Sequence, residues 1–198
     1  TNHRLSVAHE AIDSGLYATL QFPFSYLSGP QEMELVEKCR KTGMGFIAMK
    51  GMAGGLIQDG YTASAFMETQ PDVLPIWGVQ RDRELDQFLE CVKHPAAMTQ
   101  ERRATIERDR KELTGDFCRG CGYCMPCPVG IEINNCARMS LMLRRAPTSQ
   151  WLSPEWQEKM EMIRNCLHCG RCAYKCPYGL NTPKLLQANY EDYQTFLK

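Results

Sequence analysis

Two cysteine runs in the second half of the chain constrain its fold more than any other feature. Residues 118–128 read CRGCGYCMPCP, and residues 166–177 read CLHCGRCAYKCP. Each run has three cysteines that are two residues apart, then a fourth cysteine followed by proline. This spacing is typical of proteins that hold two [4Fe–4S] clusters, in which the fourth cysteine of each run binds the other cluster. The second run fits the full pattern, whereas the first is one residue shorter before its last cysteine.

The pattern also predicts which thiolates share a cluster. Three ligands come from one short stretch of chain, where small residues such as Gly120, Gly122 and Gly170 let the backbone approach the cluster closely. The proline after each fourth cysteine ends the loop, because it cannot continue a preceding helix. Crosswise ligation assigns four cysteines to each cluster: Cys118, Cys121, Cys124 and Cys176 to the first, and Cys166, Cys169, Cys172 and Cys127 to the second.

Zinc and disulfides are the alternative uses of so many cysteines. Two CxxC pairs can make a tetrahedral zinc site, but such a site leaves no role for the third cysteine of each run. No secretory segment is visible, and crowded cysteines suit a reducing compartment, so we expect a cytoplasmic protein without disulfides. Three cysteines lie outside the runs. We expect Cys39 and Cys91 to be buried on helices, and Cys136 stays open as a spare ligand.

Composition limits the classes of partner. The 198-residue chain has a formal net charge of +0 and is 43% hydrophobic, which supports a packed core. A net charge of zero gives no indication of nucleic acid or of an anionic membrane as a partner, since both favour a basic face. Its apolar stretches are shorter than the roughly 18–20 residues that a membrane span needs. The chain begins at Thr1 without methionine, and a helix pattern starts almost at once, which we interpret as a cut edge.

The first hundred residues alternate between helix and strand patterns. Apolar strands that alternate with amphipathic helices predict βαβ units and a parallel sheet, although three strands are too few to close a barrel. The expected strands are residues 18–22, 45–49 and 73–78, and the expected helices are residues 4–14, 30–43, 62–69 and 82–93.

The remaining residues read as mostly helical. We expect a charged helix over 99–113 that links two regions, and further helices over 131–143, 153–166 and from Thr182 onward. The expected domains are residues 1–98, a linking helix over 99–115, and a cluster-binding domain over 116–198.

Four segments together carry a resemblance to a known family. They are residues 16–24 (LYATLQFPF), 45–55 (GFIAMKGMAGG), 73–78 (VLPIWG) and 118–133 (CRGCGYCMPCPVGIEI). The chain resembles the C-terminal half of aldo/keto reductases with an added iron–sulfur domain, and the resemblance covers nearly its whole length. It implies an α/β region followed by an all-α region: about three βα units of a (β/α)8 TIM barrel, then an α-helical ferredoxin-like domain with two [4Fe–4S] clusters.

The resemblance also implies what is missing. The family's catalytic Tyr, Lys, Asp and His come from earlier strands, so the catalytic residues are unknown here. Residues Lys50, Gly54 and Gly55 follow a strand at the face where barrels build their sites, and either admit a cofactor phosphate or form a tight βα turn. Arg81 and Arg83 are candidate phosphate ligands for NADP, although their segment departs from the family's Lys-Ser pattern.

These observations favour an iron–sulfur oxidoreductase of aldo/keto reductase type, whose two clusters relay electrons to or from a barrel active site with its catalytic residues outside this chain. The expected partners are a ferredoxin or flavoprotein, and either the missing N-terminal barrel half or a second copy of the chain. One alternative is a non-catalytic, ferredoxin-like electron carrier or docking subunit of a redox complex. Another alternative is that the clusters only stabilise a helical domain that caps a barrel.

Overall fold

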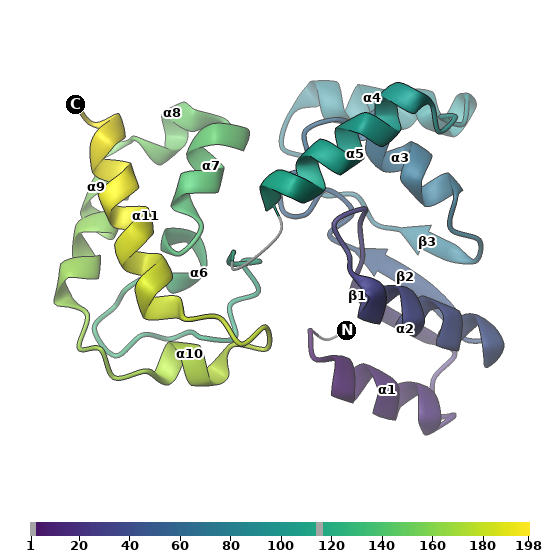
Figure 1. Ribbon diagram of the computed structural model, residues 1–198, viewed down its shortest axis with the longest axis horizontal. Helices are drawn as coiled ribbons and strands as arrows, with labels where there is room; N and C mark the ends of the chain where they lie inside the picture. The colour runs from purple at the N-terminus through teal and green to yellow at the C-terminus, as the bar shows by residue number, and fades with distance from the viewer. Residues whose placement is uncertain (1–2, 114–116) are drawn as a thin grey trace. The chain divides into compact units, whose positions relative to one another are not determined.

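The computed structural model describes residues 3–113 and 117–198. The chain forms two compact units, Thr1–Thr114 and Gly115–Lys198 (Figure 1). The first contains a small parallel sheet with helices, and the second is helical. Among the residues described, no helix is both long and apolar enough to cross a membrane.

The first unit alternates helices and strands up to its last two helices. Its elements in chain order are α1 (Leu5–Asp13), β1 (Thr19–Pro23), α2 (Pro30–Lys41), β2 (Gly45–Met49), α3 (Gly60–Glu68), β3 (Val73–Pro75), α4 (Asp82–Lys93) and α5 (Gln100–Leu113).

The three strands form one parallel sheet in the order β1-β2-β3. Leu20 lies opposite Phe46, and Phe46 lies opposite Val73, so the sheet is in register across all three strands. The third strand ends at Pro75, three residues earlier than expected. The backbone beyond it is still paired, because the Ile76 N–H donates to the Ala48 carbonyl at 2.8 Å.

Only one face of this sheet is fully buried. Leu20 and Phe22 of β1 and Phe46 of β2 pack into the core with residues of the helices. On the other face Gln21, Ile47 and Leu74 lie in register; the first two are half-buried and Leu74 is 64% exposed. The strand at 45–49 therefore has the expected bounds but is not buried on both sides. Unbroken apolar strands are typical of parallel sheets that are covered on both faces.

The helix expected to link the two regions belongs to the first unit. Ile106 of α5 is part of the core of that unit. The Tyr26 hydroxyl donates to the buried Asp109 carboxylate at 2.5 Å, and the Arg110 Nε donates to the Tyr26 carbonyl at 2.6 Å. These bonds fix a highly charged helix that offers few apolar anchors.

The second unit is built from short helices and one long one. In chain order they are α6 (Ile133–Cys136), α7 (Met139–Arg145), α8 (Thr148–Trp151), α9 (Pro154–Glu161), the 3₁₀ helix η1 (Met162–Asn165), α10 (Arg171–Lys175) and α11 (Thr182–Phe196). The single helix expected over 131–143 is wrong, because the backbone leaves the helical path between α6 and α7. The sequence patterns also missed α8 and α10.

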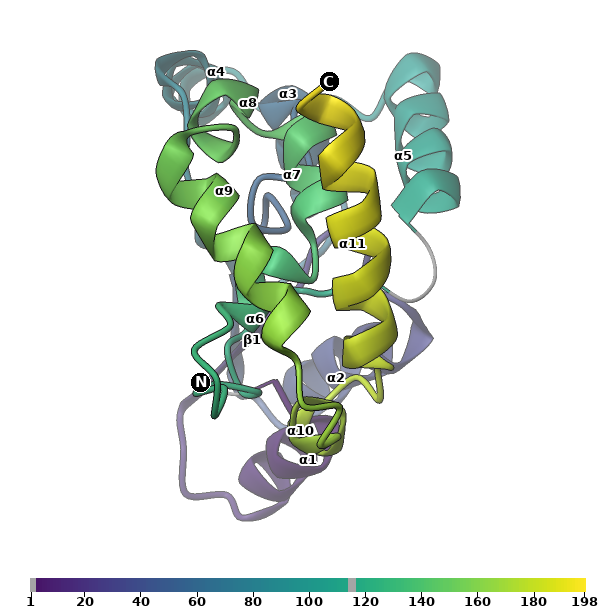
Figure 2. The same ribbon diagram turned by 90° about the vertical axis from the view of Figure 1, so that its left-hand side faces the viewer.

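The long helix α11 organises this unit. It begins where the Asn181 side chain accepts a hydrogen bond from the Lys184 N–H, and Pro183 occupies its first turn. Figure 2 shows α11 running past α9 and α7. Its Tyr193 is fully buried, and the hydroxyl donates to the Trp151 carbonyl at 2.8 Å.

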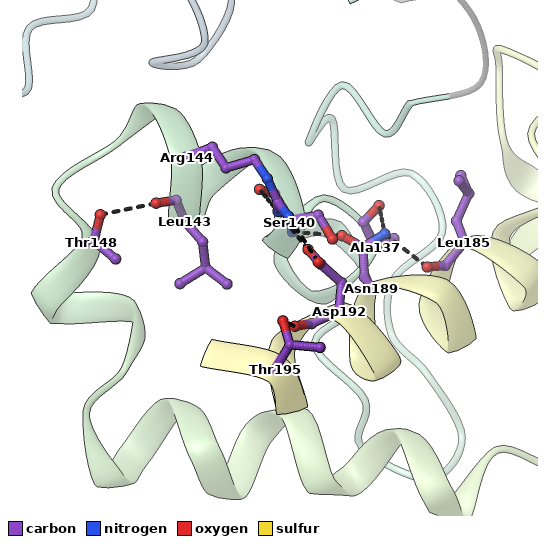
Figure 3. Close-up of polar contacts among 9 residues, drawn as sticks. All are labelled: Ala137, Ser140, Leu143, Arg144, Thr148, Leu185, Asn189, Asp192 and Thr195. Carbon is purple, nitrogen blue, oxygen red and sulfur yellow. Dashed lines mark hydrogen bonds and ion pairs between the residues drawn. The ribbon is translucent and has the colours of Figure 1, made fainter. Parts of the chain in front are cut away.

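Polar contacts tie α11 to the segment that precedes it (Figure 3). The buried Asn189 side chain accepts from the Ser140 N–H at 2.8 Å and donates to the Ala137 carbonyl at 3.2 Å. Nearer the surface, Arg144 makes two hydrogen bonds to Asp192, at 2.5 and 2.8 Å. The segment between the two cysteine runs is thus held by the helix that follows the second run.

Candidate metal centre

The first cysteine run forms an irregular loop whose backbone turns around its first sulfur. Gly120 and Gly122 have φ angles of +62° and +81°, a region that favours glycine. The Gly120 N–H donates to the Cys118 sulfur at 3.4 Å. This loop can therefore present a thiolate together with a backbone donor.

The last cysteine of the second run lies beside the first run. Burial is the main cause that raises the pKa of the Cys118 thiol above its usual value, and the neighbouring Cys121 and Cys176 raise it further. Cys176 is 58 positions (176 − 118) along the chain from Cys118. The fold thus brings a thiol of the second run to the first run, as crosswise ligation requires.

The last cysteine of the first run, in turn, lies with cysteines of the second run. One pocket of the second unit is lined by Cys166, Cys169 and Cys172 together with Cys127, the last cysteine of the first run. The remaining walls are mainly apolar and include Ile131, Ile133, Leu186 and three prolines, Pro126, Pro128 and Pro183. Thiols gathered in a mainly apolar pocket match the donor type that iron–sulfur clusters use.

The two groups of thiols adjoin at Cys124. Burial chiefly raises the pKa of the Cys124 thiol to about 12, and Cys118, Cys121 and Cys172 add to the shift. Cys124 also lines the pocket of the second group. Among residues 3–113 and 117–198, no three His, Cys, Asp or Glu side chains are placed to hold a single metal ion. The cysteines lie as neighbours in two adjoining groups.

A cationic side chain sits on the first run. The Arg138 Nη1 atom lies 2.9 Å from the position that a Cβ atom would take at Gly120, so any larger residue there would displace the guanidinium. Burial lowers the pKa of Arg138, and the nearby Cys118 opposes that shift. A positive charge therefore faces the thiols of the first group.

One cysteine of the second run is open to solvent. Cys169 is exposed, whereas all four cysteines of the first run are half-buried. Leu167 and Tyr174, on either side of Cys169 in the sequence, are 66% and 93% exposed. The accessible thiol thus belongs to a segment that also exposes two large side chains.

The three cysteines outside the runs are all buried. Cys39 on α2 and Cys91 on α4 are buried as expected. Cys136 is fully buried at the end of α6, and its thiol contacts the Lys159 carbonyl at 3.8 Å. Burial is the main cause that raises the pKa of the Cys136 thiol to about 12, as it does for Cys124, so the contact with Lys159, and not the pKa, distinguishes Cys136 from the proposed ligands.

In the first unit, the segment after β2 forms a tight loop. Lys50 and Ala53 have positive φ angles of 60° and 49°, and Gly54 and Gly55 follow with 66° and 90°. Such backbone angles are uncommon for residues other than glycine and store strain. A Cβ atom at Gly55 would overlap the Gln80 side chain, which comes from the segment after β3. The loop therefore lies where the carboxyl ends of β2 and β3 meet.

The candidate phosphate ligands do not all join this loop. Arg81 donates to the buried Glu84 carboxylate at 2.8 Å, and Arg83 is exposed. A residue that the sequence did not single out lies near Lys50 instead. The pKa of His3 is lowered to about 4, chiefly by burial and then by the charge of Lys50. No spacing pattern could have indicated this pair, because it forms only through the fold.

Comparison with protein families identifies one part of the chain. Residues 117–181 match the family model of the 4Fe-4S dicluster domain. The matched segment contains both cysteine runs and lies wholly within the second unit. Comparison with curated proteins gives no match, and comparison with solved structures gives none either. The second unit therefore contains a 4Fe-4S dicluster domain.

Proposed function

We propose that this chain relays electrons through two [4Fe–4S] clusters as part of an oxidoreductase. The crosswise grouping of the cysteines carries the proposal: Cys176 lies near enough to Cys118 for its charge to raise the pKa of that thiol, and Cys127 lines one pocket with Cys166. Sequence spacing alone cannot produce this exchange, since it requires the two runs to fold against each other. The match to the dicluster domain over residues 117–181 supports two clusters in this part of the chain.

The residues of the chain would hold and separate the clusters. Bound clusters accept and release electrons one at a time. The four thiols of each group would be the ligands, and the Gly120 N–H would stabilise the negative sulfur of Cys118. The apolar wall with Ile131 and Leu186 would shield one side of the second group from water. Cys124 would hold the two clusters close together, since it borders both groups.

We further propose that the first unit is three βα units of an aldo/keto reductase barrel. The resemblance of residues 16–24, 45–55 and 73–78 to that family supports this proposal. So does a parallel sheet with one face that is only partly buried, which further strands of a barrel would cover. The strained Lys50–Gly55 loop would lie at the barrel face that carries active sites. The Arg81–Glu84 ion pair disfavours a role for Arg81 in binding NADP.

The partly buried sheet face also supports a second candidate function. Ile47 and Leu74 could dock a partner subunit, so that the chain would be an electron carrier or docking subunit without catalysis of its own. Light scattering tests both uses of this face. Association through the sheet is the expected result, and a stable monomer with Leu74 in solvent would contradict both.

Analysis of iron and acid-labile sulfide in anaerobically purified protein tests the relay. About eight irons and eight sulfides per chain are expected. After reduction, an electron paramagnetic resonance spectrum should show two interacting clusters. Zinc without sulfide would overturn the proposal. Clusters that cannot be reduced reversibly would have a structural role only.

A further inference from the structure

The segment around the second cysteine run is basic in a chain of zero net charge. Residues 162–190 contain no aspartate or glutamate. Their basic residues are Arg164, Arg171, Lys175 and Lys184. Arg164 pairs with Glu161, just before this segment, at 3.5 Å, which leaves Arg171, Lys175 and Lys184. The charge at the second run is therefore locally unbalanced.

Helix α10 gathers this charge on one side. Arg171, Tyr174 and Lys175 are spaced i, i+3 and i+4, so they share a face of the helix, while Cys172 is buried. Within the described part of the chain, neither Arg171 nor Lys175 forms an ion pair. Tyr174 is 93% exposed between them. We call Leu167, Cys169, Arg171, Tyr174 and Lys175 the α10 surface.

The composition of the α10 surface fits a transient protein contact. Exposed tyrosine and arginine side chains are typical of the centres of interfaces. A rim of like charge attracts a partner of opposite charge and speeds its association. Weak redox complexes bury small areas, so a short helix with one adjoining loop is large enough. Cys169, a proposed cluster ligand, lies exposed within this surface.

We propose that the α10 surface is the docking site for a small acidic electron-transfer protein, one that surrounds its own redox centre with carboxylates. The inference rests on the proposed relay, because an accessible second cluster is what makes this surface useful. Arg171 and Lys175 would pair with the carboxylates of the partner. Leu167 and Tyr174 would exclude water from the centre of the contact.

The test measures the affinity of the full, cluster-loaded chain for an acidic plant-type ferredoxin by titration calorimetry. The variant Arg171→Gln/Lys175→Gln removes two positive charges, and we expect it to bind about tenfold more weakly at low ionic strength. The affinity of the unchanged chain should fall as salt screens the charges. Basic cytochrome c, as a probe of opposite charge, should bind more weakly than the ferredoxin.

A matched control separates local from overall charge. Lys198→Glu changes the net charge by the same two units, and it lies at the end of α11 that Figure 1 shows far from α10. This control should change the affinity less than twofold. Tyr174→Ser should weaken binding without altering charge, and since Tyr174 is exposed, the fold should be unaffected.

Each result decides the inference. Equal affinities for the double variant and Lys198→Glu, binding that ignores salt, or tighter binding of cytochrome c would each overturn the docking site. Iron and sulfide are measured in every variant first. Full iron content with no charge dependence would overturn the docking site and leave the relay intact. A chain without iron or sulfide would remove the relay and the docking site with it.

Discussion

The two cysteine runs are nearly the same in sequence and differ in what surrounds them. At the first run the Arg138 guanidinium packs on Gly120, and every cysteine is half-buried. At the second run Cys169 is exposed, and Tyr174 projects almost wholly into solvent. Spacing determines which cofactor a run can bind, whereas the neighbours determine access and charge. We infer that the second cluster exchanges electrons with partners and that the first is the inner one.

The largest expected effect is the loss of one cluster through a change in the other run. Cys176→Ser should abolish the cluster of the first run, because Cys176 lies beside Cys118. Iron should fall from about eight to about four per chain. Cys118→Ser should leave the same surviving cluster by electron paramagnetic resonance, whereas Cys127→Ser should leave the other one.

Cys136→Ala is the control for these variants. It removes a thiol that is buried against the Lys159 carbonyl and is expected to retain all the iron. If Cys176→Ser and Cys166→Ser left the same surviving cluster, each run would bind its own cluster, and the crosswise ligation would be wrong.

The second largest effect is expected for Asn189→Leu, which should destabilise the surroundings of both cysteine runs equally. Asn189 holds the Ala137 carbonyl and the Ser140 N–H, so Asn189→Leu leaves both without their partner. We expect a loss of about 2 kcal/mol in the free energy of unfolding, measured by urea denaturation. Both clusters should then be lost faster in air, at equal rates. Gln187→Ala is the matched control on α11, because Gln187 is exposed and bonds only to Glu191 of the same helix.

A selective loss of one cluster in Asn189→Leu would contradict this shared support. It would mean that α7 and α11 stabilise one run alone.

Arg138→Leu should change the reduction potential of the first cluster more than that of the second. Removal of a positive charge beside Cys118 disfavours an added electron, so the reduction potential of the first cluster should fall by on the order of 50–100 mV. The second cluster should shift much less. A redox titration followed by electron paramagnetic resonance measures both potentials. Arg164→Leu is the control, since Arg164 is exposed and paired with Glu161. Equal shifts of both clusters would contradict the assignment of Arg138 to the first.

Much of this arrangement was available from the sequence. The cysteine spacing predicted a dicluster domain, and the match over residues 117–181 confirms it. Periodicity located the bounds of β2 and α4, because a short apolar run between glycines and a strongly amphipathic helix are clear local signals. The break between α6 and α7 was missed, since nothing in residues 131–143 is a helix breaker.

Other features depend on contacts between distant residues. The Asp109 carboxylate anchors α5 through Tyr26, 83 positions away, and no local pattern announces such a bond. Arg138 was missed for the same reason, because its proximity to Gly120 arises only when α6 and α7 fold back onto the first run. The spacing of the cysteines therefore does not predict the neighbouring residues that distinguish the two runs.

The smallest expected effect lies away from both runs. Arg144 binds the Asp192 carboxylate through two hydrogen bonds, which lower the pKa of Asp192 below its usual 3.8. A carboxylate with a lowered pKa adds stability above the pKa of the unfolded state and loses it as the pH falls through the folded value. Asp192→Asn should therefore destabilise the chain by about 0.5–1 kcal/mol, the same from about pH 5 to about pH 9.

Urea denaturation at several pH values in this range measures the difference in the free energy of unfolding between the unchanged chain and Asp192→Asn. Arg144→Met in the Asp192→Asn background should add almost nothing, because the pair is already broken. Both potentials and the iron content should stay unchanged, since this ion pair contacts neither run. A loss of stability in Asp192→Asn that grows between about pH 5 and about pH 9 would show that Asp192 titrates there and would contradict the lowered pKa. A changed reduction potential in either cluster would instead mean that the α7–α11 contact influences the cysteine runs. The difference between the two runs would then depend on more than the residues next to them.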